Sequence, residues 1–93
     1  MKSKDLEKVR RKIDKLDFKF LNLIKKRTKL VEKVIRLKKY KKQIVDKKRI
    51  KRVLRNIKKN SIKNKIDHRI TVAIWSAMIR SYISYEKRNF YKK

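Results

Sequence analysis

Apolar side chains recur at alternating spacings of three and four residues along the first part of the chain. One polar residue, Arg27, interrupts a series that otherwise consists of apolar positions: Leu6, Val9, Ile13, Leu16, Phe20, Leu23, Arg27, Leu30, Val34 and Leu37. This is the seam of a helix that packs lengthwise against another helix. It predicts one continuous helix from about Asp5 to about Lys41, roughly 55 Å long. The rest of the chain is too short to cover that stripe, so we expect a second copy of the chain to cover it.

The remainder of the chain predicts two shorter helices, each beginning at an aspartate. Asp46 and Asp67 are the expected N-caps, where a carboxylate meets free backbone N–H groups. After Asp46, apolar residues at i, i+3, i+4 and i+7 predict a short amphipathic helix: Ile50, Val53, Leu54 and Ile57. We expect this helix to end at Asn60-Ser61, and a third helix to run from about His68 to about Phe90. The predicted fold is all-α, with a long, a short and a medium helix in one domain over residues 1–93.

Composition narrows the function without identifying it. The chain of 93 residues has 34 Lys and Arg against 8 Asp and Glu, for a net charge of +26, and 24 of the cations are Lys. Such a charge suits nucleic acid, an anionic membrane surface or small anionic substrates. Because Ile and Asn are also abundant, part of the excess Lys fits the coding bias of an AT-rich genome. With 40% apolar residues, the chain is too apolar for a disordered basic tail.

Several classes of site and location are disfavoured by what the sequence lacks. There is no Cys for a disulfide or thiolate site and no Gly for a phosphate-binding loop. The longest apolar run is too short to span a bilayer and the N-terminus has no apolar segment, so we expect a cytoplasmic protein that does not enter membranes. No nucleophile–base pair and no metal-ligand cluster is recognisable, so we expect neither cofactor nor metal. An enzyme built from this chain would hold an anion and stabilise charge.

The candidate chemistry therefore rests on cations and one carboxylate. Arg27 lies within the apolar seam, where a lone cation is costly unless it meets an anion; the alternatives are a residue that fixes the helix register or an Arg that extends to the edge. Lys38 follows 11 residues later on nearly the same helix face. For Arg10 and Arg49 the simpler interpretations are an ion pair with Asp14 and a solvated charge.

Glu86 ends an apolar row on the third predicted helix, which runs through Trp75, Ile79, Tyr82 and Ile83. Burial there disfavours the charged form of a carboxyl group, whereas neighbouring cations favour it, so we expect the two effects to oppose each other. Tyr82 and Trp75 are more often core aromatics than ligand contacts.

Taken in order, these residues resemble the all-helical chorismate mutases. The resemblance is carried by segments spread from Leu6 to Phe90: Arg10…Ile13-Asp14-Lys15-Leu16-Asp17, Lys26-Arg27…Leu30-Val31…Val34…Leu37-Lys38, Ile44-Val45-Asp46-Lys47-Lys48-Arg49 and Ile74-Trp75…Met78-Ile79…Tyr82-Ile83…Tyr85-Glu86. Each segment is modest alone, but the ordered set, with an Arg inside the seam, is fairly specific.

The resemblance implies an intertwined homodimer with two active sites that converts chorismate to prephenate without cofactor or covalent intermediate. It implies that Arg10 reaches into the partner's site and that Arg10 and Arg27 bind the two substrate carboxylates. Lys38 would also donate to the ether oxygen that gains charge as the C–O bond breaks. Glu86 lies where the family uses Gln or Glu against the same oxygen, and as Glu it must be protonated to donate.

The predicted substrate-binding set also includes Asp46, Arg49 and Tyr82; at Tyr82 some mutases have a small hydroxyl residue, so the backbone is the expected contact there. Many mutases follow the second-helix Arg with a Glu that accepts the ring hydroxyl, and here that residue is Ile50. Isochorismate-pyruvate lyases of the same fold are apolar at that position. We therefore expect a chorismate mutase, with such a lyase as the alternative. A basic helical nucleic-acid-binding protein is less favoured because Arg27 lies inside the seam, whereas phosphate contacts come from exposed cations.

Overall fold

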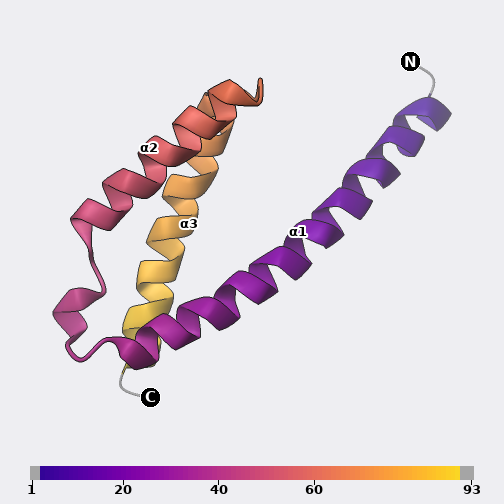
Figure 1. Ribbon diagram of the computed structural model, residues 1–93. Coiled ribbons are helices and arrows are strands. Elements are labelled where there is room, and N and C mark those ends of the chain that lie inside the picture. The colour runs from indigo at the N-terminus through magenta and orange to yellow at the C-terminus, as the bar shows by residue number, and fades with distance from the viewer. Residues whose placement is uncertain (1–2, 91–93) are drawn as a thin grey trace. The chain divides into compact units, whose positions relative to one another are not determined.

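The computed structural model describes residues 3–90, and all of its regular structure within that range is helical (Figure 1). The elements are α1 (Ser3–Leu37), the short 3₁₀ helix η1 (Lys41–Gln43), α2 (Lys47–Lys63) and α3 (His68–Asn89). The predicted all-α fold with a long, a short and a medium helix is confirmed. The single domain over 1–93 stays a prediction, and residues 1–2 and 91–93 lie outside the described part. Two compact units, residues 3–32 and 33–90, are described separately below.

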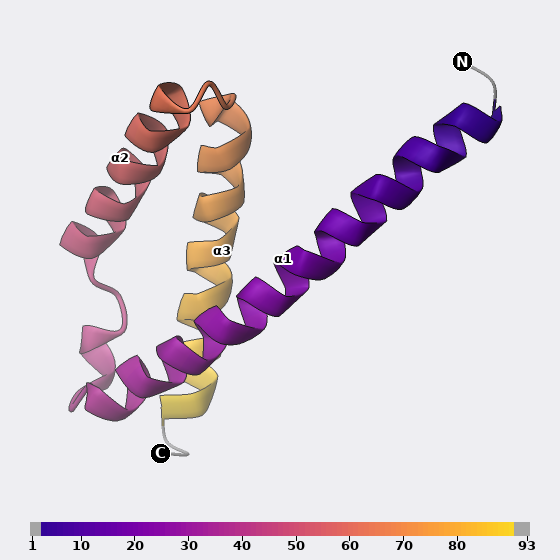
Figure 2. The same cartoon turned by 45° about the vertical axis from the view of Figure 1, so that its right-hand side comes forward.

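Helix α1 is uninterrupted in both views (Figures 1 and 2) but ends four residues before the predicted Lys41. The backbone N–H of Lys38 still bonds the carbonyls of Val34 and Ile35. The next two N–H groups, those of Lys39 and Tyr40, instead donate to the side-chain oxygen of Gln43, at 2.8 and 2.9 Å. A chain without Gly or Pro thus ends its longest helix with a side-chain acceptor that competes for the backbone donors.

Helix α2 continues past the predicted end at Asn60-Ser61 and finishes at Lys63. Ser61 lies within the helix, where its hydroxyl donates to the carbonyl of Ile57 at 2.6 Å. The turn is formed instead by Asn64 and Lys65, and Lys65 takes a left-handed backbone conformation with φ of 58°. The N–H of Ile66 then bonds the Ser61 carbonyl at 2.8 Å, which closes the helix end as a glycine normally would.

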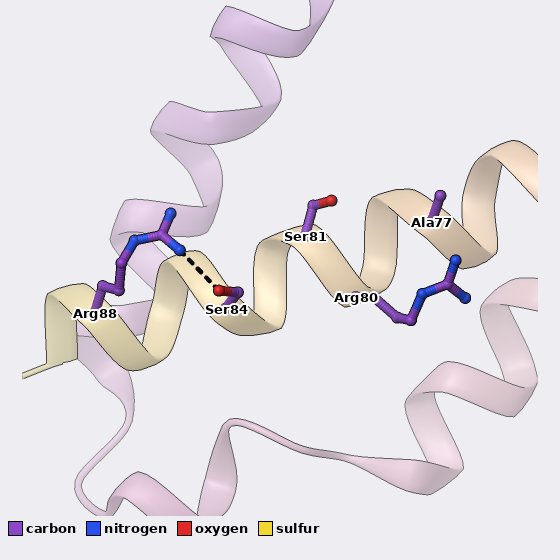
Figure 3. Close-up of a pocket in the computed structure, with 5 residues that line it drawn as sticks. All are labelled: Ala77, Arg80, Ser81, Ser84 and Arg88. Atoms are coloured by element: carbon purple, nitrogen blue, oxygen red, sulfur yellow. Dashed lines mark hydrogen bonds between the residues drawn. The ribbon is translucent and has the colours of Figure 1, made fainter.

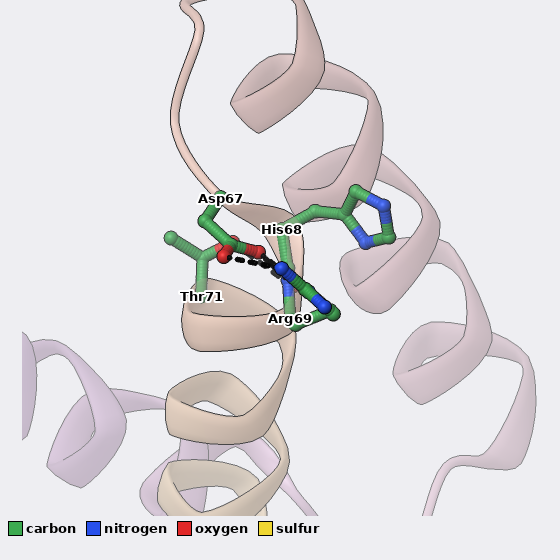
Figure 4. A network of polar contacts seen from close by, with 4 residues as sticks. All are labelled: Asp67, His68, Arg69 and Thr71. Carbon is green, nitrogen blue, oxygen red and sulfur yellow. Dashed lines mark hydrogen bonds and ion pairs between the residues drawn. The ribbon is translucent and has the colours of Figure 1, made fainter.

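Both predicted aspartate caps are confirmed. The Asp46 carboxylate accepts from the N–H of Arg49 at 3.0 Å at the start of α2. At the start of α3, the Asp67 carboxylate accepts from the backbone N–H of Arg69 (Figure 4). The Arg69 side chain also donates to it, with Nε 3.2 Å from Oδ1 and Nη2 3.1 Å from Oδ2. The Arg69 side-chain hydrogen bond, and then the backbone one, hold the pKa of Asp67 below its ordinary value.

Helices α2 and α3 form the packed part of the unit 33–90, where they run side by side in opposite directions (Figures 1 and 2). Near the turn that joins them, the hydroxyls of Ser61 and Thr71 are 2.7 Å apart. Ser61 is buried, and no buried side-chain N or O atom among residues 3–90 lacks a partner. Buried apolar side chains are few: Ile35, Ile44 and Phe90.

The apolar seam of α1 is solvent-exposed within the single chain. Leu16, Phe20 and Leu23 are 55%, 59% and 59% exposed, and the other apolar seam residues from Val9 to Leu37 are also exposed. A row of exposed apolar side chains along one helix is typical of a surface that another chain covers.

Replacing Ser61 with Ala tests the hydroxyl pair between α2 and α3. The substitution removes the Ser61 hydroxyl, and Thr71 keeps only a 3.4 Å hydrogen bond to the His68 carbonyl, so we expect a loss of about 0.5–1.5 kcal/mol in the free energy of unfolding. Urea denaturation followed by circular dichroism measures it. Ser81→Ala, at an exposed position on α3, serves as the control and should change stability little.

Asp67→Asn tests the charge at the α3 N-cap while keeping a capping side chain. Because the folded pKa of Asp67 is lowered, its contribution to stability is present above its unfolded pKa of about 3.9 and is lost as pH falls through the folded value. We expect the variant to be less stable than the parent at neutral pH and the difference to vanish in stronger acid. Asp17→Asn removes an equal charge from an exposed site on α1; an identical pH dependence for the two variants would contradict the assignment.

Candidate active site

An ion pair joins two predicted catalytic residues that are 48 positions apart in the sequence. The Lys38 Nζ lies 3.1 Å from Glu86 Oε1, and the two side chains are only 20% and 10% exposed. Lys38 follows the end of α1, and Glu86 lies in the last turn but one of α3. In this setting the pair is screened less by solvent than an exposed one would be.

Glu86 is buried, as the apolar row on α3 predicted. The residues of that row, Trp75, Ile79, Tyr82 and Ile83, are all half-buried. Tyr82 lies one turn before Glu86, and its ring meets that of Tyr85 edge-on, with 6.4 Å between centroids. The one buried carboxylate of the described chain thus ends a row of half-buried aromatic and aliphatic side chains on α3.

Asp46 and Arg49 lie together at the start of α2, but the contact between them is a backbone cap. The Asp46 carboxylate is engaged by the Arg49 N–H, and the side chains of both residues are exposed. Ile50, at the position that distinguishes mutases from lyases in the family, is half-buried in the first turn of α2. No carboxylate of the described chain replaces it in that turn.

Arg10 and Arg27 lie in the other unit, on the stretch of α1 with the exposed seam. Arg27 is half-buried. Arg10 is exposed and pairs with Glu7 at 3.1 Å, not with Asp14 as the helical spacing suggested. The structure thus brings Lys38 and Glu86 together, places Asp46 and Arg49 at one helix start, and describes Arg10 and Arg27 only within α1.

A shallow hollow along α3 was not anticipated from the sequence (Figure 3). It is lined by Ala77, Arg80, Ser81, Ser84 and Arg88. Arg88 Nη1 donates to the Ser84 hydroxyl at 2.7 Å. The sequence signal for the hollow is the recurrence of small side chains at helical spacing, at Ala77, Ser81 and Ser84.

Comparison with known proteins matches residues 9–87 to the family described as chorismate mutase type II. No curated protein and no solved structure matched the chain. The matched range includes α2, most of α1 and α3, and every candidate site residue, so the chain belongs to the type II chorismate mutase family. The activity of this family is an isomerisation, the rearrangement of chorismate to prephenate, and chorismate is the substrate it implies. None of the helices within residues 3–90 is long and apolar enough to cross a bilayer.

Proposed function

We propose that the chain catalyses the chorismate–prephenate rearrangement as one domain over residues 1–93, at a site built around Lys38 and Glu86 and completed by a second copy. The observation that carries the proposal is the Lys38–Glu86 ion pair, because it brings together, largely away from solvent, the two side chains that the family resemblance assigns to the ether oxygen of the substrate. A cytoplasmic location remains part of the prediction.

The reaction proceeds without a covalent intermediate and depends on electrostatic stabilisation. The substrate carries two carboxylates, and its ether oxygen gains negative charge as the C–O bond breaks. Fixed N–H donors aimed at that oxygen stabilise the transition state more than the ground state. The Lys38 ammonium has three N–H donors, so it can serve both a carboxylate and the ether oxygen.

During the reaction, Glu86 would exchange Lys38 for the ether oxygen of the substrate as its hydrogen-bond partner. In the structure it accepts from Lys38; against the ether oxygen it must donate, which requires the protonated acid. The two negative charges of the substrate repel a carboxylate, and its ether oxygen can only accept, so the proposal requires the neutral, donating form of Glu86 in the complex.

Arg27 and Arg10 are the proposed carboxylate ligands, since Arg forms two parallel hydrogen bonds to a carboxylate. Arg49 and Asp46 are proposed to face the substrate from the start of α2, with Tyr82 contributing from α3. The exposed seam of α1 supports a second copy as the source of Arg10, because two such helices would cover each other and bring each Arg10 to the partner's site.

Alanine substitution of the proposed cations is the direct test of the site. We expect Lys38→Ala and Arg27→Ala each to cost several kcal/mol in kcat/KM, on the scale of about 2.7–4 kcal/mol for a lost oxyanion donor. Arg36→Ala removes an equal charge from an exposed position on α1 and should change little. Loss of the same size in all three variants would mean that overall charge, not a site, is being measured.

The pH dependence tests the donor role of Glu86. We expect the wild type to lose activity toward alkaline pH and Glu86→Gln to keep it, because a carboxyl group can donate only in its acid form, whereas an amide N–H donates at any pH. Prephenate formation is measured from mildly acidic to alkaline pH, with pyruvate release from isochorismate followed in parallel. A flat wild-type profile, or an inactive but folded Gln variant, would remove Glu86 from the donor role.

Mixing two inactive variants tests the shared site. If Arg10 acts in the partner's site, a dimer of one Arg10→Ala chain and one Lys38→Ala chain has one intact site and one doubly impaired site. Random pairing should therefore restore about a quarter of wild-type activity. Sedimentation should show a dimer at micromolar concentration; a folded, active monomer, or no recovery after verified subunit exchange, would contradict the proposal.

A further inference from the structure

The outward side of α2 carries a concentration of positive charge that the mutase site does not use. Apart from Arg49, the helix has eight cations, and every one is exposed: Lys47, Lys48, Lys51, Arg52, Arg55, Lys58, Lys59 and Lys63. There is no Asp or Glu in α2. Five of the eight carboxylates of the chain lie in α1, and the others are the caps Asp46 and Asp67 and the buried Glu86.

No α2 cation forms an ion pair with a carboxylate of the described chain. The ion pairs Arg10–Glu7, Lys38–Glu86 and Arg69–Asp67 all lie elsewhere. Like charges four residues apart, such as Lys48 and Arg52 or Arg55 and Lys59, repel each other and destabilise the helix. An external polyanion would relieve that repulsion along the length of α2, about 25 Å.

The chemistry of the surface distinguishes among polyanions. An interfacial membrane helix needs an exposed apolar side, but the apolar row of α2 (Ile50, Val53, Leu54 and Ile57) is half-buried, on the helix that packs against α3. A protein interface has an apolar or aromatic centre, whereas the outward side of α2 contains one exposed apolar residue, Ile62, and no aromatic. The absence of aromatic rings from α2 also disfavours single strands, which are bound by base stacking.

We propose that the outward side of α2 binds the phosphate backbone of double-stranded nucleic acid, without sequence selectivity, as an activity separate from the mutase reaction. Lys48, Arg52, Arg55 and Lys59 recur at i, i+4, i+7 and i+11 and form the centre of this surface, opposite Leu54 and Ile57. Phosphate contacts from Lys and Arg alone suffice for such binding, and each releases bound counterions, so affinity falls steeply with salt. The sequence favoured an enzyme over a nucleic-acid-binding protein because Arg27 lies in the apolar seam of α1. That argument concerns a different helix and does not conflict with nucleic-acid binding by α2.

The test compares two full-length variants that lose the same amount of charge. In the first, Lys48, Arg52, Arg55 and Lys59 are replaced with Gln on α2. In the second, Lys8, Arg11, Lys15 and Lys25 are replaced with Gln at exposed positions of α1. Removing like charges from α2 should not unfold it, and circular dichroism with the mutase assay checks that both proteins are intact.

Binding to a fluorescent random-sequence DNA duplex is measured by anisotropy between about 50 and 200 mM salt, the range over which phosphate contacts weaken strongly. We expect the α2 variant to bind about tenfold or more weakly and to lose about 3–4 units of the slope of log affinity against log salt, while the α1 variant retains most of both. Equal losses in the two variants would show that net charge, not α2, drives binding. Stronger α2-dependent binding to vesicles containing anionic lipid than to the duplex would assign the surface to membranes instead. If both variants keep their mutase activity, a change in DNA binding can be attributed to the α2 surface and not to damage of the proposed active site.

Discussion

The uncovered apolar stripe of α1 is the constraint on which the rest of the molecule depends. A helix of 35 residues carries its large apolar side chains largely exposed, and the unit 33–90 buries only a few apolar residues of its own. Burial of an exposed Leu or Phe stabilises by about 1.5–3 kcal/mol, so covering the stripe would stabilise the chain substantially. In the proposed dimer, a second copy would cover the stripe and would bring Arg10 of one chain to the site of the other, so that assembly and catalysis would be coupled.

Carboxylates are scarce in this chain, and the proposed site is built around the one that is buried. Seven of the eight are in α1 or at helix N-caps, and Glu86 alone is buried. The chain has a net charge of +26, so many cations could pair with a buried carboxylate. The partner of Glu86 is Lys38, the residue that the family resemblance assigns to the same oxygen of the substrate. In the proposed mechanism, the pair keeps the ammonium and the carboxyl group close to each other before substrate arrives. Ile50 leaves the first turn of α2 without a carboxylate for the ring hydroxyl, so substrate recognition at the proposed site would depend more on the cations.

Charge is distributed differently on α1 and α2, and we propose two different binding functions for the cations of this chain. In α1 five carboxylates are interspersed among the cations, whereas α2 has cations alone, all exposed to solvent, and its apolar row lies on the helix side that packs against α3. A small dianion needs a few cations at fixed positions with water excluded. A polyphosphate needs many exposed cations in a row and no fixed geometry. Within the proposed active site, the Lys38–Glu86 pair fits the first arrangement, and the outward side of α2 fits the second.

The sequence by itself determined the helical fold, the starts of α2 and α3 and the burial of Glu86, because periodicity and aspartate caps act within a few residues. It misplaced the ends of α1 and α2. The Gln43 side chain takes the backbone donors that would have extended α1, and Ser61 stays helical because its hydroxyl bonds the preceding turn and Thr71 of α3. The sequence suggested Asp14 as the partner of Arg10, whereas rotamer choice on one helix face gave Glu7. Only the tertiary structure joined Lys38 to Glu86, since a contact between residues 48 positions apart depends on how the helices pack and not on any local pattern.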